Sequence, residues 1–228
     1  MELGAPVLEA RDLVFEREVD GRVVRVLDHV SLAIRPGDII ELRGESGAGK
    51  TTLLRALARL LPGVCGELVL DGRPDREVDP RLWRTRVTLL PQRAALLPGS
   101  VEENLGFPFT LAVRKHTDPP SAEKFRAGMD ALGLDDVALS RDVTQLSVGQ
   151  AARVALLRVL LARPAVLLLD EPDASLDDAS AARLGEATAR FAAEGGALVR
   201  VSHLRADATA TRSLRLAAGQ LMEVSNAG

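Results

Sequence analysis

The feature that most constrains this chain is a glycine-rich stretch that reads Gly44-Glu45-Ser46-Gly47-Ala48-Gly49-Lys50-Thr51-Thr52. It fits the pattern G-x-x-x-x-G-K-[ST], in which the glycines allow successive backbone N–H groups to surround a phosphate. Residues 39–42 before it predict a short buried strand, and residues 52–61 after it predict a helix, whose N-terminus adds positive potential. The spacing predicts that Lys50 reaches the β- and γ-phosphates of a nucleotide and that the Thr51 hydroxyl binds Mg²⁺.

The composition limits what kind of protein this is. The 228 residues, 46% hydrophobic and 27% charged, are enough for one globular domain. A net charge of −3 argues against a nucleic-acid partner held by phosphate neutralisation. The single cysteine, Cys65, excludes an internal disulfide, and we expect a buried thiol. No apolar run approaches the ~20 residues of a membrane span, and no secretory signal is visible, so we expect a cytoplasmic protein.

A second motif lies in residues 166–171, where an apolar run ends in Asp170 and Glu171. A continuous apolar run is typical of a parallel strand that is buried on both faces, and ligands of such sheets bind beyond the carboxyl ends of the strands. We expect Asp170 to face the Mg²⁺ beside Thr51. Glu171 would face the γ-phosphate and orient or deprotonate a water. The alternative is that Asp170 and Glu171 are only solvated carboxylates at a strand end. The phosphate loop elsewhere in the chain makes this alternative less favoured.

The remaining pattern predicts an α/β core, residues 1–92 and 164–228, interrupted by a mostly helical insertion over residues 93–163. Asp20-Gly21 between two alternating runs predicts a hairpin, and hence an antiparallel β layer ahead of the core. Four prolines between residues 93 and 120 predict an irregular segment. Helices are expected over 121–132, with Ser121 as N-cap, 149–162 and 179–193, strands over 67–70, 86–92, 165–170 and 197–201, and a hairpin over 213–224.

The order of short motifs along the chain resembles that of an ABC ATPase. After the phosphate loop come Gln92 at a strand end, Leu146-Ser147-Val148-Gly149-Gln150 before a helix, and Asp170-Glu171. Ala174-Ser175-Leu176-Asp177 and Val201-Ser202-His203 follow. Ser147 alone reads as a helix N-cap and His203 alone as a structural histidine. The joint order covers essentially the whole chain.

This resemblance implies a P-loop NTPase (RecA-like) core, ATP and Mg²⁺ as ligands, and a head-to-tail homodimer that encloses two ATP molecules. Glu171 would position or deprotonate the water, His203 would stabilise the transferring group, and Gln92 would sense Mg²⁺. Asp177 would line the dimer interface. The residues of one copy would be Lys50, Thr51, Gln92, Asp170, Glu171 and His203, and those of the other would be Ser147, Gly149 and Gln150.

Two positions depart from the family pattern. Val148 replaces the first glycine of the usual Leu-Ser-Gly-Gly-Gln, whereas Gly149 is kept. Where the family commonly stacks an aromatic residue on adenine, the alignment places Arg17, whose guanidinium can also lie flat on a base. Phe15 is the alternative adenine contact, although its place in a strand favours a core role.

The segment from Leu96 to Phe109 is similar to the one that follows the glutamine in transporter ATPases, and its Phe-Pro-Phe resembles the bacterial Fet-type iron exporter. This implies a membrane permease that docks near Gln92 to Phe109 and holds the chain at the inner face of the membrane. Phe107 and Phe109 could instead pack under the insertion. Phosphate or other importer ATPases stay open as alternatives, and so does a soluble iron–sulfur assembly ATPase that acts as a nucleotide-gated clamp.

Overall fold

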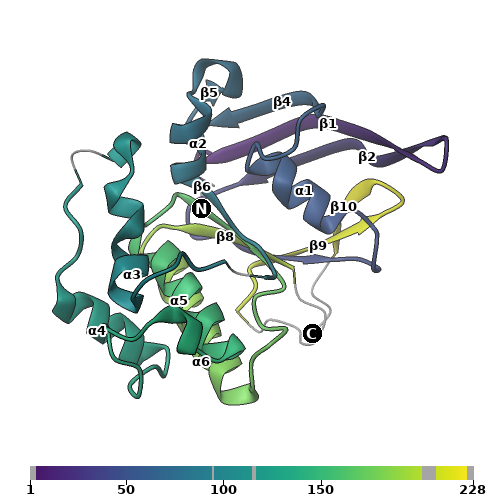
Figure 1. Cartoon of the computed structure of the whole chain (residues 1–228). Coiled ribbons are helices and arrows are strands. Elements are labelled where there is room, and N and C mark those ends of the chain that lie inside the picture. Colours follow the sequence, from purple (N-terminus) through teal and green to yellow (C-terminus); the bar gives the residue numbers. More distant parts are fainter. Residues whose placement is uncertain (1–3, 94, 115–116, 202–208, 225–228) are drawn as a thin grey trace.

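The computed structural model describes residues 4–93, 95–114, 117–201 and 209–224, which form two β-sheets with helices between and beside them (Figure 1). The smaller sheet is antiparallel and contains the expected hairpin. Asp20 and Gly21 both have positive φ, 50° and 74°, as a two-residue hairpin turn requires. The strand order in this smaller sheet is β2-β1-β4-β5. The strands are β1 (Leu8–Val19), β2 (Arg22–Ile34), β4 (Cys65–Leu70) and β5 (Arg73–Pro74).

The larger sheet forms the core of an α/β fold. Its order is β10-β9-β3-β8-β7-β6, and all neighbouring strands run parallel except the β9–β10 hairpin. The carboxyl ends of β3, β8, β7 and β6 therefore lie at one edge. The strands are β3 (Ile39–Arg43), β6 (Val87–Leu90), β7 (Val166–Asp170), β8 (Ala197–Val201), β9 (Arg212–Ala217) and β10 (Gln220–Val224).

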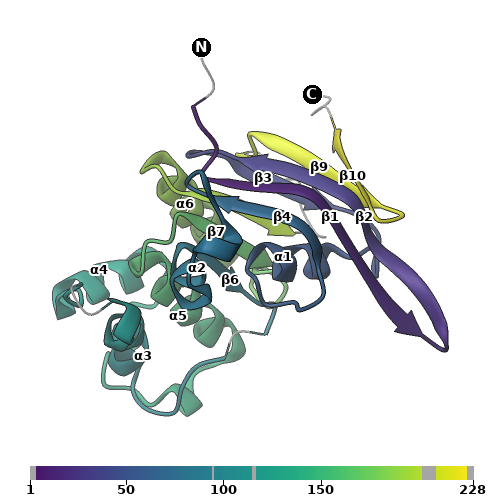
Figure 2. The ribbon, with the colours of Figure 1, turned by 90° about the horizontal axis from the view of Figure 1, so that it is seen from above.

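The helices divide between two positions. Helix α1 packs between the two sheets, while α3, α4, α5 and α6 gather on the other face of the larger sheet (Figures 1 and 2). The helices are α1 (Lys50–Leu57), α2 (Pro80–Arg86), α3 (Val101–Thr110), α4 (Ala122–Ala131), α5 (Val148–Leu161) and α6 (Asp178–Ala193), with 3₁₀ turns at Asp75–Glu77, Ala112–Arg114 and Val143–Gln145.

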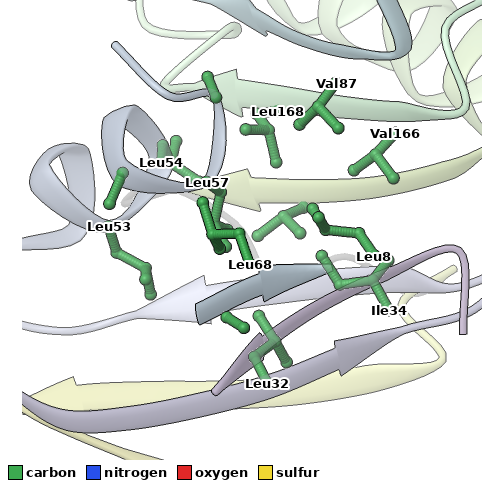
Figure 3. Close-up of a cluster of buried hydrophobic side chains, with 14 of the residues drawn as sticks. Leu8, Leu32, Ile34, Leu53, Leu54, Leu57, Leu68, Val87, Val166 and Leu168 are labelled. Carbon is green, nitrogen blue, oxygen red and sulfur yellow. The ribbon is translucent and has the colours of Figure 1, made fainter. Parts of the chain in front are cut away.

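Two hydrophobic clusters hold these layers together. In the first, Leu53, Leu54 and Leu57 of α1 lie between Leu168 of β7 and Leu68 of β4 (Figure 3). All three α1 leucines are fully buried. At about 1.5–3 kcal/mol for each buried side chain, this packing fixes the helix that follows the glycine-rich loop. The second cluster covers the opposite face of the sheet with residues of α3 to α6.

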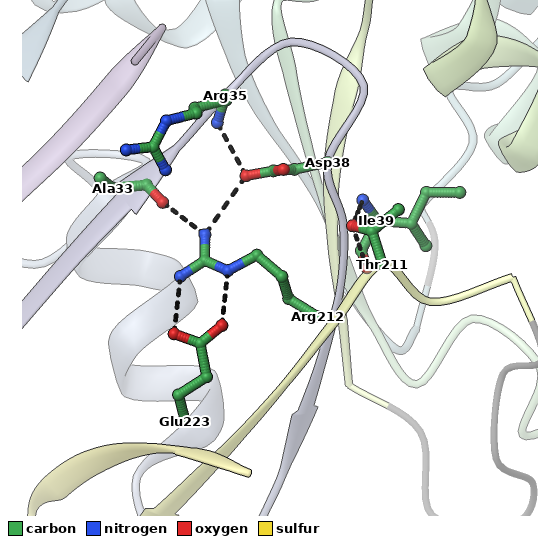
Figure 4. Close-up of polar contacts among 7 residues, drawn as sticks. All are labelled: Ala33, Arg35, Asp38, Ile39, Thr211, Arg212 and Glu223. Carbon is green, nitrogen blue, oxygen red and sulfur yellow. Dashed lines mark hydrogen bonds and ion pairs between the residues drawn. The ribbon is translucent and has the colours of Figure 1, made fainter. Parts of the chain in front are cut away.

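A polar anchor joins the β9–β10 hairpin to the strand that enters the glycine-rich loop (Figure 4). The Arg212 guanidinium donates to the Ala33 carbonyl at 2.7 Å, to Asp38 at 3.3 Å and, through Nε, to Glu223 at 2.9 Å. Asp38 directly precedes β3. One side chain thus links β2, β3, β9 and β10, and it holds the edge of the sheet against the small antiparallel layer.

Several local expectations were wrong. Residues 101–110 form α3 although Pro108 lies inside it, because Ser100 and Glu103 make a reciprocal capping box at its start. Residue 86 ends α2, an unexpected helix with Asp79 as N-cap and Pro80 at its first position. The Cys65 thiol is exposed, not buried.

Helix α1 also ends at Leu57, four residues before the predicted end. Arg59 adopts a left-handed conformation with φ 53° and stops the helix. The Arg59 guanidinium offsets the cost of this backbone conformation. It donates to the carbonyls of Asp75 and Val78, at 2.8 Å each, and lies 5.3 Å from the centre of the Trp83 ring. The boundary of the helical insertion at residues 93 and 163 stays a prediction.

Candidate nucleotide-binding site

The glycine-rich loop joins the end of β3 to the start of α1, as the motif predicts. Gly44 and Gly49 have φ of 155° and 100°, in the region that favours glycine. A Cβ atom at Gly44 would lie 2.5 Å from the Leu216 carbonyl oxygen, and one at Gly49 would lie 2.9 Å from a Val26 methyl. The loop therefore fits against β9 and β2 only with glycine at both positions.

Lys50 lies inside this loop. Its side chain is buried, and its ammonium donates to the carbonyls of Gly44 and Glu45, each at 2.8 Å. A buried ammonium needs such acceptors. The residues at the tip of the loop, Glu45, Ser46 and Gly47, are exposed, whereas Ala48 and Thr52 are half-buried. The loop thus presents its backbone to solvent around a fixed positive charge.

Thr51 and Asp170 meet beside the loop. The Thr51 hydroxyl lies 2.9 and 3.1 Å from the two carboxylate oxygens of Asp170, which ends β7. Burial raises the pKa of Asp170, while the hydrogen bond from Thr51 opposes that rise. A nearby cation would favour the ionised carboxylate.

Glu171 and Gln92 form the next contact at this edge. The Gln92 amide donates to a Glu171 carboxylate oxygen at 2.7 Å, although 79 residues separate them in the chain. Glu171 has φ 50°, an uncommon backbone conformation for a residue with a side chain, and its N–H donates to the Val201 carbonyl. Such strain is often found at functional sites. The structure thus brings together Lys50, Thr51, Asp170, Glu171 and Gln92.

The Leu-Ser-Val-Gly-Gln stretch begins helix α5. Ser147 is its N-cap and forms a capping box with Gln150, with Ser147 Oγ accepting from the Gln150 N–H at 3.2 Å. Val148 is 73% exposed. A Cβ atom at Gly149 would lie 3.4 Å from the Ser175 carbonyl oxygen, so this turn packs against the segment that follows β7.

Three further site predictions have different outcomes. Asp177 is the N-cap of α6 and accepts from the Ser180 N–H at 2.7 Å, which lowers the pKa of Asp177. Arg17 is exposed on β1, whereas Phe15 is half-buried and packs against the first core cluster. His203 lies outside the described residues.

The geometry also fits a magnesium site that depends on a phosphate ligand. Within the described part of the chain, no group of three or more His, Cys, Asp or Glu side chains could hold a metal ion. Mg²⁺ is usually bound by one or two protein ligands together with substrate phosphates and waters. Thr51 and Asp170, with their oxygens 2.9 Å apart, suit that pattern.

Two further side chains near the site were given no role by the sequence analysis. Asp136 accepts from the Gln150 amide at 3.1 Å, yet it lies in no motif. Asn104 is almost fully buried and binds both backbone groups of Leu97, in the segment after Gln92. The fold and the site together define a P-loop NTPase with a phosphate loop, an Asp–Glu strand end and a helical insertion.

Comparison with known proteins gives the family. The ABC transporter family matches residues 27–174, which is more than half of the chain. The chain therefore belongs to the ABC transporter family. No helix among its described residues has the length and apolarity that a membrane crossing requires.

Individual relatives of the chain agree with this family assignment. The chain is 38% identical over 200 residues to the cytochrome c biogenesis ATP-binding export protein CcmA 2 of Cupriavidus metallidurans, and these cover 87% of this chain and 90% of CcmA 2. It is 30% identical over 170 residues to the probable iron export ATP-binding protein FetA of Escherichia coli, with 75% and 74% covered. Protein STAR1 of rice is 36% identical over 222 residues, which span 96% of this chain and 62% of STAR1.

Solved structures share the fold. A dimeric ATP-binding cassette in a post-hydrolysis state, bound to ADP and Pi, superposes with a TM-score of 0.81 at 23% identity. The match covers 97% of this chain and 99% of that chain. A bacterial Atm1-family ABC exporter with ATP bound also gives 0.81 at 24% identity, and this chain covers 39% of it.

Proposed function

We propose that this chain is a Mg²⁺-dependent ATPase subunit that powers a separate membrane permease, and that two copies close head to tail around two ATP molecules. The observation that carries the proposal is the meeting of Thr51 with both carboxylate oxygens of Asp170, at 2.9 and 3.1 Å. That pair lies at the mouth of a glycine loop with a buried lysine. Groups suited to binding phosphate and a metal ion thus converge at one edge of the sheet.

Each residue at this edge has a proposed task. The loop N–H groups and Lys50 would hold the β- and γ-phosphates, and Thr51, Asp170 and Gln92 would hold Mg²⁺, whose charge would offset that of the transferring phosphoryl group. Glu171 orients the attacking water and accepts its proton. The Gln92–Glu171 hydrogen bond at 2.7 Å orients that carboxylate. His203 would stabilise the transferring group, and Arg17 would stack on adenine.

The second copy would complete the site. Ser147, Gly149 and Gln150 lie together at the N-terminus of α5, where backbone N–H groups and positive potential suit a γ-phosphate. Ser147 Oγ accepts a hydrogen bond from the Gln150 N–H, so the hydrogen of its hydroxyl stays available for a phosphate oxygen. Asp177 would line the interface between the copies.

The permease would dock beside α3. Leu97, Phe107, Leu111 and Val113 are 41%, 37%, 36% and 37% exposed, and Phe109 is half-buried. Exposed apolar side chains within one short segment of the chain suit an interaction site. Asn104 and Arg158 hold the segment before α3 through the Leu97 backbone and the Ala95 carbonyl. A partner that contacts this segment would therefore act on Gln92 and on α5. Such docking would place the chain at the inner face of the membrane.

The first cargo to test is iron, and the direction of transport to test is export. This choice rests on the Leu96–Phe109 segment and on the relative named for iron export. Another relative, 37% identical over 211 residues, is named for hemin import, so relatives of both directions exist.

The test of the dimer uses Glu171→Gln, which keeps the nucleotide contacts and removes the proton acceptor. We expect this variant to form a dimer with ATP and Mg²⁺ by light scattering, and to stay monomeric with ADP. A variant that binds ATP but remains monomeric would overturn the sandwich.

The test of the permease compares Phe107→Ser with Val23→Ser, an exposed residue near the hairpin turn, as control. With a multi-span membrane protein encoded beside this gene, membranes should retain the wild type and Val23→Ser and should release Phe107→Ser. Copurification with soluble assembly proteins instead would favour the nucleotide-gated clamp.

A further inference from the structure

A rigid turn lies beside the N-terminus of α5 and presents a carboxylate to it. Residues 134–137 form this turn, in which the Val137 N–H donates to the Leu134 carbonyl at 3.0 Å. Leu134 and Val137 are completely buried, so both ends of the turn are fixed in the core of the helical side. Asp135 and Asp136 occupy its two central positions and are exposed.

Two arginines hold this turn and its approach. Arg126 of α4 donates to the carbonyls of Leu134 and Val137, each at 2.8 Å. Arg153 of α5 donates to the carbonyls of Leu132 and Gly133, at 3.0 and 2.7 Å. These bonds link α4, the turn and α5. The position of Asp136 relative to α5 is thus set by the fold and not by its own exposed side chain.

Asp136 uses this position to hold Gln150. The Gln150 amide nitrogen donates to the Asp136 carboxylate at 3.1 Å, while its amide oxygen accepts from the Ser147 N–H at 3.0 Å. Both ends of the carboxamide are occupied, which selects one side-chain rotamer. Gln150 in turn donates its backbone N–H to Ser147 Oγ at 3.2 Å. A chain of contacts therefore runs from the turn through Gln150 to Ser147.

We propose that Asp136 is a positioning residue for the ATP molecule of the opposite subunit: it holds Gln150, and through it Ser147, in the arrangement that receives the partner's γ-phosphate. This inference rests on the proposed function, because it concerns the site that closes between two copies. Asp136 touches neither nucleotide nor water in this scheme. Its loss should weaken closure of the dimer and leave binding of a nucleotide to the phosphate loop of one copy unchanged.

The experiment measures ATP-dependent dimerisation by light scattering in the Glu171→Gln background. Asp136→Ala should weaken the dimer about tenfold, because each of the two sites must then order a Gln150 side chain that is no longer held in place, at about threefold for each side chain. Asp136→Asn keeps an oxygen acceptor for Gln150 and should restore dimerisation. Asp135→Ala removes the same charge one residue away. In the described part of the chain it is Asp136, and not Asp135, that hydrogen-bonds to Gln150, so this variant should dimerise like the parent.

Two further measurements exclude a general loss of structure. ADP affinity, from an equilibrium titration, should be the same in Asp136→Ala and in the parent. The thermal midpoint, from circular dichroism, should differ by no more than about 3 °C, the shift that the loss of one exposed hydrogen bond allows. In a Gln150→Ala background, Asp136→Ala should have no additional effect, because the residue acts through Gln150.

The outcomes separate the two proposals. If the Glu171→Gln parent forms no dimer with ATP, the proposed function fails and the inference fails with it. If the parent dimerises and Asp136→Ala dimerises equally well or better, the inference alone is overturned. Equal weakening in Asp135→Ala would also overturn it, because charge rather than the contact with Gln150 would then be the cause.

Discussion

Asn104 gives a quantitative test of how the segment after Gln92 is held. This side chain is 1% exposed and makes four hydrogen bonds: it accepts from the Leu97 N–H and from Arg158, and donates to the carbonyls of Leu97 and Ser100. Asn104→Ala removes all four. At about 0.5–1 kcal/mol for each bond, the lower half of the usual range because water can reach Leu97, the loss is about 2–4 kcal/mol.

Urea unfolding followed by circular dichroism measures this loss. With a slope of about 3 kcal/mol/M, we expect the midpoint to fall by about 1 M. Glu102→Ala, an exposed position on the same helix, is the control and should stay within about 0.5 kcal/mol of the wild type. If Asn104→Ala unfolds at the midpoint of the control, the four bonds do not hold this segment, and the proposed link between the docking surface and α5 loses its basis.

Three other variants probe separate parts of the structure. Lys50→Ala should weaken ATP binding about 10- to 100-fold in an equilibrium titration, with Lys124→Ala on α4 unchanged; equal affinity would contradict the phosphate-loop assignment. Trp83→Phe loses the 2.9 Å hydrogen bond to the Leu57 carbonyl, so its free energy of unfolding should fall by about 1–3 kcal/mol. An unchanged unfolding midpoint, measured by circular dichroism, would refute this expectation. The hydrogen bond from Arg212 lowers the pKa of Glu223 below 4.5. The free energy of folding that the ionised Glu223 contributes is therefore lost as pH falls through this lowered pKa. Acid unfolding of Glu223→Gln should lack this component, of at most about 1 kcal/mol.

Much of the site could be predicted because its residues belong to motifs with fixed spacing. The glycine loop, the strand that ends in Asp170, and Gln92 at the end of another strand each follow from local patterns. Parallel topology then brings the carboxyl ends of those strands to one edge. The contacts Thr51–Asp170 and Gln92–Glu171 confirm that these side chains meet, although their chemical roles stay proposals.

Other features could not be predicted because they depend on tertiary contacts. Pro108 suggested a break, yet the capping box of Ser100 and Glu103 and the packing of α3 on α5 stabilise the helix around it. Asp136 contacts Gln150 only because buried neighbours and Arg126 fix the turn that contains Asp136. No spacing rule links residues whose contact depends on a turn of this kind. The Asp79-Pro80 start of α2 is different, since its N-cap signal is local and could have been used.

The most direct measurement of the central claim is the ATPase rate of the purified wild type and of Glu171→Gln, with and without Mg²⁺. The account predicts a wild-type rate that requires Mg²⁺ and that Glu171→Gln abolishes, while ATP binding by the variant is retained. A wild-type rate that persists without Mg²⁺, or that is equal in Glu171→Gln, would contradict the assignment of catalysis to the carboxylates that end β7.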